Sequence, residues 1–394
     1  MLKIQNIDSI CTGCSACYNI CPHSAIRIVE RNGGFYYPEV DEGKCVGCGL
    51  CEKTCPAMSQ ENEAAVFSAY MFKSSDDSVV YNSSSGGAFT AMADWILKKR
   101  GVVYGARYDY QTRHLEHSGT DECGLEELKK SKYIESYIGD TYKKIKKNLK
   151  EDRYVLFVGT PCQIAGLYKY LGRMNSYEKL FTVDFVCHGV PSNQLFSDYL
   201  RYEEMKNKTV LTHFDFRPKE KGWRGRIFKL EFANGKSLLQ PVRENYYYYA
   251  FNQKWMLRES CYNCTMLKNS FSDITIGDFW GIGNIEQFKD ENKGMSMAVI
   301  HTAKGQIFFS KIAEGNFIRD LSMKDIAYIY IEREVDSGYD PQRRRRLMSE
   351  VSQRGYMEVL KEHYWDEMFR ERLHTFISSR VKNILIFLGI WKRK

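Results

Sequence analysis

The chain contains the stretch Cys11-Thr-Gly-Cys14-Ser-Ala-Cys17-Tyr-Asn-Ile-Cys21-Pro22 and, later, the stretch Cys45-Val-Gly-Cys48-Gly-Leu-Cys51-Glu-Lys-Thr-Cys55-Pro56. Each has the spacing C-x2-C-x2-C-x3-C-P, which is typical of ferredoxins that carry two [4Fe–4S] clusters. The second run lies 34 residues after the first at every cysteine. This internal duplication predicts a compact domain of about sixty residues, residues 1–60, folded around two clusters.

The same spacing predicts which cysteines share a cluster. Three cysteines at intervals of three wrap one cube, while the fourth begins the next helix and reaches the other cube. We therefore expect one cluster on Cys11, Cys14, Cys17 and Cys55, and the other on Cys45, Cys48, Cys51 and Cys21. Between the runs, AIRIVERNGGFYYPEV indicates two strands joined by an Asn-Gly-Gly turn, a hairpin expected to cover the clusters. Zinc knuckles or a disulfide framework are the alternatives, but neither needs the third C-x-x-C step or the trailing Cys-Pro.

Composition places the chain among soluble, cytoplasmic proteins. It has 394 residues and 13 cysteines, with no apolar leader before Cys11 and no run long enough to span a membrane. Cysteines in a reducing cytoplasm are more often metal ligands than disulfides. The formal net charge of +8 counts thiols as neutral. Three clusters of about −2 each would leave about +2, so the basic balance is poor support for nucleic-acid binding.

After the polar segment 59–65, strand-like and helix-like stretches alternate. VFSAYMF, GVVYGARYD, YVLFVG and LFTVDFV have strand character, and helical patterns follow them, as in GGAFTAMADWILKK and TPCQIAGLYKYL. This alternation predicts a larger α/β domain whose functional loops lie at the carboxyl ends of its strands. Residues 210–243 are expected to form a β-hairpin with Asn234-Gly235 as its turn.

Three loops and five further cysteines mark the candidate site of this domain. The loops are Ser83–Thr90, Gly159–Gln163 and Gly277–Gly281; the first has the composition of a phosphate or flavin-edge site, or of an ordinary helix N-cap. Cys162, Cys187, Cys261 and Cys264 occur on three loops and would suffice for a third cluster, leaving Cys123 over. Spacing alone also fits small buried hydrophobes, a redox dithiol or half of a zinc site. His188 is a candidate proton relay, although a lone loop histidine is more often structural.

At these motifs the chain resembles the coenzyme F420 hydrogenase/dehydrogenase beta-subunit family. The resemblance rests on Ser85-Gly-Gly-Ala-Phe-Thr90, Gly159-Thr-Pro-Cys-Gln-Ile164, Cys187-His-Gly189, Cys261-x-x-Cys264 and Ile276-Gly-Asp-Phe-Trp280, over residues 66–335. It implies FAD beside a third [4Fe–4S] cluster on Cys162, Cys187, Cys261 and Cys264, with hydride exchanged to coenzyme F420 or another small acceptor. The implied cofactor-binding residues are Ser85, Gly86, Gly87, Thr90, Gly159, Thr160, Pro161, Gln163, Gly277, Asp278 and Trp280.

Residues 336–394 are expected to form a basic helical tail. Arg343–Arg346 is interpreted as a solvated helix face, and the apolar run Val381–Lys394 as a segment that packs on its own domain, on a partner or on a membrane surface. Lys143–Lys150 predicts an amphipathic surface helix, and Tyr246–Tyr249 a helix packed in the core.

Three functions are compared on this basis. A flavin-dependent iron–sulfur oxidoreductase, served by a ferredoxin or another redox protein, accounts for both regions. A non-catalytic electron carrier would need no large α/β domain. A nucleic-acid protein would need aromatic stacking platforms on a basic surface, and ranks last.

Overall fold

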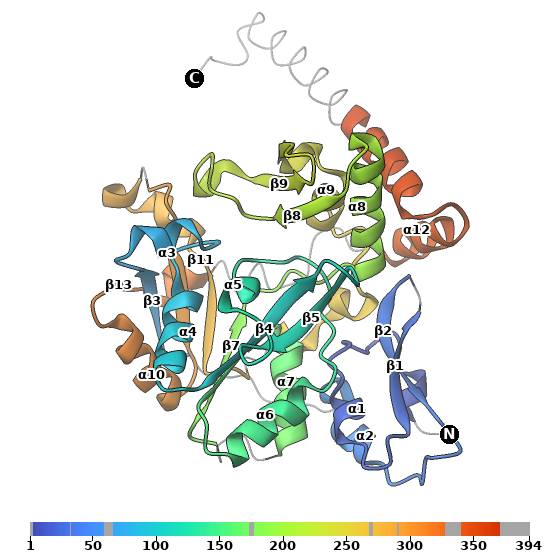
Figure 1. The fold of residues 1–394 in the computed structure, drawn as a ribbon, viewed down its shortest axis with the longest axis horizontal. Coiled ribbons are helices and arrows are strands. Elements are labelled where there is room, and N and C mark those ends of the chain that lie inside the picture. Colours follow the sequence, from blue (N-terminus) through green and yellow to red (C-terminus); the bar gives the residue numbers. More distant parts are fainter. Residues whose placement is uncertain are drawn as a thin grey trace, which may run out of the picture.

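The computed structural model describes residues 3–31, 33–58, 66–172, 177–267, 271–289, 291–327 and 340–370. An N-terminal module lies against a larger mixed α/β region (Figure 1). The elements of the module are the short 3-10 helices η1 (Lys3–Asn6) and η2 (Pro56–Met58), the helices α1 (Ala16–Ile20) and α2 (Leu50–Lys53), and the strands β1 (Ile26–Arg31) and β2 (Phe35–Val40).

The predicted hairpin of the module is confirmed. β1 and β2 pair antiparallel from Ile26↔Val40 to Arg31↔Phe35, and Gly33 and Gly34 turn between them at positive φ, where glycine is favoured. Alternate hairpin residues, including Tyr37, pack in one cluster with Cys11, Cys17, Cys51 and Cys55. One face of the hairpin therefore covers the cysteine loops, as expected.

An eight-stranded mixed sheet forms the centre of the larger region. Its order is β13-β3-β12-β11-β7-β6-β4-β5, and β4, β6, β7 and β11 run parallel. The strands are β3 (Ser68–Lys73), β4 (Val102–Asp109), β5 (His114–Gly119), β6 (Val155–Gly159), β7 (Leu180–Phe185), β11 (Ile274–Asp278), β12 (Ser296–Ile300) and β13 (Phe317–Asp320). The predicted strands occur in the predicted order, and because β11 is parallel to β7, their carboxyl ends share one edge.

Helices cover both faces of this sheet because its strands alternate apolar side chains between them. On β4, Val102 and Tyr104 pack with α6 and α7, whereas Val103 packs with α4 and α10. The helices are α3 (Asp77–Tyr81), α4 (Ala88–Lys98), α5 (Leu125–Leu128), α6 (Thr141–Lys150), α7 (Pro161–Leu171) and α10 (Ala303–Ala313). The amphipathic helix predicted at Lys143–Lys150 is confirmed as part of α6, which buries Ile145.

A second core lies over the sheet's loop-bearing edge. It contains the antiparallel sheet β10-β9-β8, the helices α8 and α9, and the C-terminal helices. The bounds are α8 (Asn193–Asn207), β8 (Leu211–Asp215), β9 (Ile227–Phe232), β10 (Ser237–Pro241), α9 (Tyr246–Asn252) and α12 (Pro341–Arg354). The hairpin predicted around Asn234-Gly235 is confirmed as β9–β10, and Tyr247, Tyr248 and Tyr249 are buried in the core as expected.

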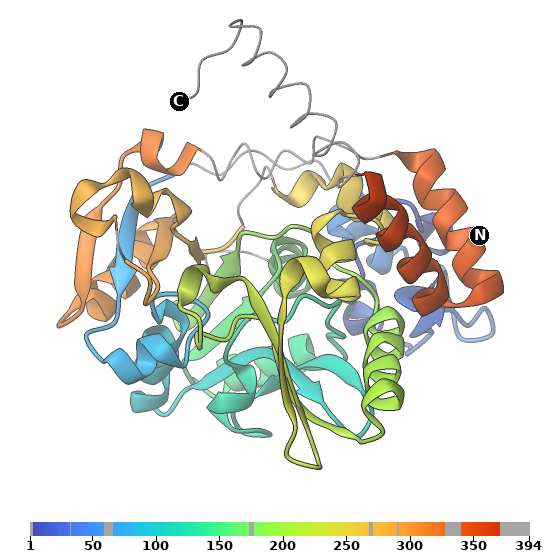
Figure 2. The same cartoon turned by 90° about the horizontal axis from the view of Figure 1, so that it is seen from above.

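The described part of the C-terminal tail packs into this second core rather than lying apart. Leu347 of α12 and Leu360 of the helical stretch 356–370 are fully buried (Figure 2). The expectation of a solvated arginine face is wrong for Arg344, which is 9% exposed and donates Nε to Leu257 O, and it holds for Arg345 and Arg346.

Several predictions fall outside the described residues. The segment Val381–Lys394, the polar segment 59–65 and the proposed boundary near residue 336 are among them. Within the described residues, no helix is long and apolar enough to cross a membrane.

Candidate redox site

The three predicted loops line one cavity at the shared edge of the strands. Gly159 ends β6, Phe185 ends β7 and Asp278 ends β11, and all three line a cavity of about 1310 Å³. Of the eleven residues predicted to bind a cofactor, every one except Gly86 lines it. The topology thus brings together loops that are more than a hundred residues apart in sequence.

The four cysteines of the second set also line this cavity. Burial raises the pKa of the Cys187 thiol to about 12, and the neighbouring Cys162 and Cys264 raise it further. The pKa of Cys261 is raised by burial and by Cys187, Cys264 and Cys162. Four thiols gathered in this way suit a cluster, since four irons spread four thiolates and supply the positive charge that they need.

Within the described chain, no three His, Cys, Asp or Glu side chains are spaced to hold a single metal ion. The ferredoxin cysteines interact in the crossed pattern predicted from their spacing. Burial and then Cys55 raise the pKa of Cys14, and Cys21 is among the groups that raise the pKa of Cys51. The two sets differ in exposure, because Cys14 is 8% exposed whereas Cys48 is exposed.

The Ser-Gly-Gly loop leads into a helix whose first turn has no side-chain cap. Gly87 is the N-cap of α4, at φ 93°, and no side chain accepts from the first amides. Such amides, with the helix dipole, form a ready site for an anion. Gly86 has a different role, since a Cβ there would clash with Phe72 O and lie 2.6 Å from Ser296 N. It permits a close backbone approach and does not line the cavity.

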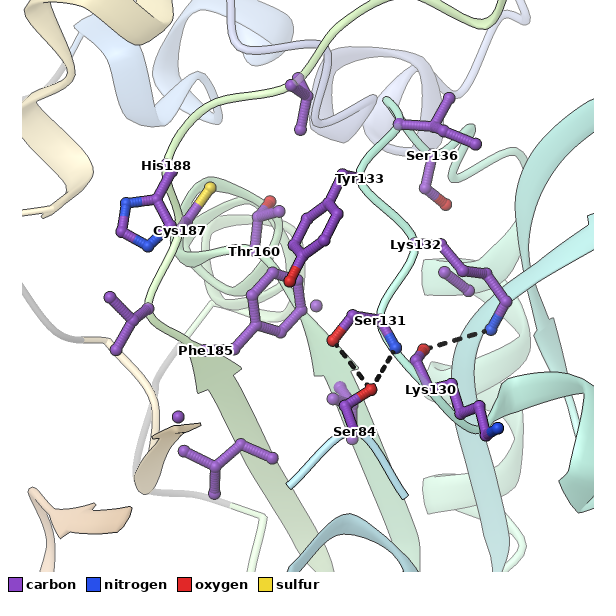
Figure 3. Close-up of a pocket in the computed structure, with 18 of the residues that line it drawn as sticks. Ser84, Lys130, Ser131, Lys132, Tyr133, Ser136, Thr160, Phe185, Cys187 and His188 are labelled. Atoms are coloured by element: carbon purple, nitrogen blue, oxygen red, sulfur yellow. Dashed lines mark hydrogen bonds between the residues drawn. The ribbon is translucent and has the colours of Figure 1, made fainter. Parts of the chain in front are cut away.

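Sequence reasoning missed the segment that faces this loop, residues 129–136. Ser131 donates its amide to Ser84 Oγ at 2.8 Å, and Lys132 Nζ donates to Lys130 O at 3.4 Å (Figure 3). Lys129, Lys130 and Lys132 all line the cavity. The signal was the run Lys129-Lys130-Ser-Lys132, which resembles a solvated charge run and lacks any glycine-rich motif.

Gln163 also differs from its predicted role, since its side chain is committed to the protein. Its Oε1 accepts from the Thr160 amide at 3.0 Å, and its Nε2 donates to Ser136 O at 3.2 Å. Gln163 therefore fixes the start of α7, and with it Cys162, against the segment 129–136.

The Gly-Asp-Phe-Trp loop contributes an ordered charge and an aromatic wall. Asp278 accepts from Arg217 at 2.8 Å and from the Trp223 indole at 2.8 Å. The Trp223 and Trp280 rings stack with centroids 4.6 Å apart, and the Arg217 guanidinium lies 5.1 Å from the Trp280 centroid. Asp278 thus orients a cation and a planar ring at the cavity rather than offering a free carboxylate.

Two histidines line the cavity. His188 lies on the loop after Cys187, partly exposed, and remains a candidate for proton transfer (Figure 3). His117, which the sequence did not single out, is buried between Ser136 and the carbonyl of Val158.

A dicluster ferredoxin module beside a mixed α/β domain, with four more cysteines in one cavity, defines an iron–sulfur electron-transfer protein of the oxidoreductase type. Residues 152–325 belong to the family described as the C terminus of the coenzyme F420 hydrogenase/dehydrogenase beta subunit, and residues 10–58 to that described as "4Fe-4S dicluster domain". The resemblance seen in the sequence is confirmed.

Curated relatives agree with these two regions. The chain is 25% identical over 324 residues to the coenzyme F420-dependent sulfite reductase of Methanocaldococcus jannaschii, covering 76% of this chain and 46% of that protein. It is 39% identical over 51 residues to a component of the ion-translocating oxidoreductase complex of Methanosarcina acetivorans, covering 13% of this chain and 17% of that one. The chain thus spans less than half the length of these relatives.

Among solved structures, a chain of the F420-reducing [NiFe] hydrogenase complex from Methanosarcina barkeri is similar, with a TM-score of 0.47 and 15% identity. The match covers 75% of this chain and 96% of that chain.

Proposed function

We propose that this protein is an iron–sulfur flavoprotein oxidoreductase that exchanges hydride with coenzyme F420 or another small acceptor. Two [4Fe–4S] clusters belong to the ferredoxin module, and a third is held by Cys162, Cys187, Cys261 and Cys264. FAD occupies the cavity, where it would supply the conversion between one-electron and two-electron chemistry. A ferredoxin or another redox protein is the partner.

The observation that carries the proposal is the meeting of four cysteines with an anion-ready loop in one cavity, next to the ferredoxin module. Thr12 and Gly13 of the module line the same cavity as Cys162 and Cys187. A Cβ on Gly166 of α7 would lie 3.0 Å from Cys14 Sγ, so the helix that begins beside Cys162 touches an N-terminal cluster cysteine.

The cavity residues also fit a flavin dinucleotide. The amides that begin α4, with Ser84, Ser131 and Lys132, are suited to phosphates. Tyr133 and Trp280 offer flat apolar surface. The volume of about 1310 Å³ exceeds the 300–1,000 Å³ typical of pockets for one small ligand, leaving room for a substrate beside the cofactor.

The residues divide the work between binding and shielding. Arg217, held by Asp278, presents a fixed positive charge at the cavity and favours an anionic ligand. The second core, with Tyr248 and Phe251 in the lining, limits access of water to one side of the cavity. His188 is the residue we propose for moving a proton, at its imidazole ring.

The proposal is tested by iron, acid-labile sulfide and flavin content of protein purified without oxygen. We expect about twelve irons and one FAD per chain. Cys187→Ser should lose about four irons, whereas the matched control Cys123→Ser, outside both cysteine sets, should lose none.

About eight irons and no flavin after reconstitution would refute the enzyme. That result would leave the alternative, a non-catalytic electron-transfer protein that serves a partner enzyme. If FAD is present, reduced protein is then screened against coenzyme F420 and other two-electron acceptors, and a lack of any hydride exchange would again favour the carrier.

A further inference from the structure

The two cysteine sets of the ferredoxin module face different surroundings. The outer set (Cys21, Cys45, Cys48 and Cys51) includes the exposed Cys48, flanked by Gly47 and Gly49, whose added Cβ atoms would meet nothing within 4 Å. The inner set (Cys11, Cys14, Cys17 and Cys55) is 7–8% exposed at every member. An electron arriving from outside therefore meets the outer set first.

One cation of the large domain reaches into the inner set. Arg258 is fully buried and donates Nε to Cys11 O at 2.6 Å, and Nη2 to Tyr36 O at 2.7 Å and to Cys11 Sγ at 3.4 Å. Its guanidinium lies 4.3 Å from the Tyr37 ring centroid. Ser260 adds a hydrogen bond of 2.8 Å to Cys11 O, so the segment leading to Cys261 is fastened to the Cys11 loop.

Glu135 balances this cation from the side of the cavity. It forms a buried ion pair with Arg258 Nη1, and its other oxygen accepts from the Tyr36 amide at 3.2 Å. The pair is neutral as a whole, but its positive end touches Cys11 and its negative end does not. Burying such a pair is costly, and a hydrophobic pair of similar volume would often serve stability equally well. The orientation of the charges therefore invites a functional explanation.

We propose that Arg258 is a positioning residue that raises the reduction potential of the inner cluster above that of the outer cluster. Reduction adds one electron, and hence one negative charge, to a cluster; a fixed positive charge at the Cys11 sulfur favours the reduced form. Electrons passed from the outer cluster then settle on the cluster nearest α7. The inference rests on the two ferredoxin clusters of the proposed function and needs neither the flavin nor the third cluster.

The test is a potentiometric titration of the full, cluster-loaded protein followed by EPR. The double variant Arg258→Gln/Glu135→Gln removes both charges without leaving one buried alone, and should move the inner potential to more negative values. Glu135→Gln keeps Arg258 but removes its counter-charge, and should move it to more positive values. The outer cluster is identified by signal broadening from a soluble paramagnetic chelate, because Cys48 is exposed.

Arg344→Gln is the matched control, since Arg344 is also buried and binds Leu257 O beside Arg258. It should leave both potentials unchanged. Opposite shifts of the inner potential alone support the proposal, because a purely structural role would not change sign between the two variants. If the double variant loses iron, Glu135→Gln decides: an unchanged or more negative inner potential overturns the proposal. Absence of flavin would refute the proposed function while both ferredoxin potentials stayed measurable.

Discussion

His117 illustrates how burial alone changes the chemistry of one side chain. Its Nε2 lies 3.0 Å from Val158 O, which can only accept, so Nε2 carries the proton and Nδ1 accepts from Ser136 Oγ. Burial, with Lys132 nearby, lowers the pKa of His117 from 6.5 to about 4, although the Val158 carbonyl opposes the change. The neutral ring therefore belongs to the folded state.

This lowered pKa predicts a pH-dependent stability. The unfolded chain binds a proton at His117 below about pH 6.5 and the folded chain does not, so stability is lost as the pH falls from 6.5 toward 4. The full effect is about 3 kcal/mol. We expect urea unfolding to show that the stability lead of the wild type over His117→Gln shrinks by about 2–3 kcal/mol across that range. His23→Gln, which removes an exposed histidine, should give no such change.

Asp278 makes a second residue-level prediction. Asp278→Asn removes the charge that holds Arg217 and should cost about 1–3 kcal/mol of stability, because both side chains are largely buried. It should also weaken flavin retention, since Arg217 and the Trp280 stack lose their anchor. Thermal unfolding and flavin content measure the two effects. Asp77→Asn breaks an exposed pair with Lys293 and should change stability by less than about 1 kcal/mol.

At the scale of the element, the start of α4 is the feature with the clearest chemical consequence. Ser84 lines the cavity just before this uncapped helix. Ser84→Asp would place a negative charge where a phosphate is proposed to bind, and should lower flavin affinity at least about tenfold while leaving the fold stable. Ser84→Asn has the same shape without the charge and should lower flavin affinity far less. Equal losses in both variants would contradict an anion site at this helix.

Elements were predictable where a local pattern determines them. The cysteine runs, the Asn-Gly turn of β9–β10 and the alternating strands β4, β6 and β7 each follow from residues close in sequence. The roles of Gly86 and Arg258 depend on partners more than two hundred residues away, Ser296 for one and Cys11 for the other. No local pattern contains those partners. Lys132 was missed for a related reason, because only the fold turns a lysine run toward a cavity.

The whole molecule brings one-electron sites and a large cavity together by packing the ferredoxin module on the α/β domain. Tyr36 of β2 bonds to His114 at 2.8 Å, and Asn19 of α1 donates to Gly139 O at 2.9 Å. The C-terminal helices join the same contact, since Met348 and Tyr356 lie against Gly33. These contacts join segments from all three regions, so we infer that the module is held in one orientation.

Gly166 is the point at which this packing is closest to a cluster cysteine, and it makes the last prediction. A Cβ there would lie 2.9 Å from Tyr142 Oη and 3.0 Å from Cys14 Sγ, so Gly166→Leu must push α7 and the Cys14 loop apart. Leucine is a good helix former, and the loss of stability, about 1–3 kcal/mol, would therefore report the contact and not helix propensity. Hydrogen exchange should rise in α1 and α7, and electron transfer from the ferredoxin clusters to the cavity should slow. Gly124→Ala, at an open position, is the control. Unchanged exchange and an unchanged rate would mean that the path between the two regions runs elsewhere.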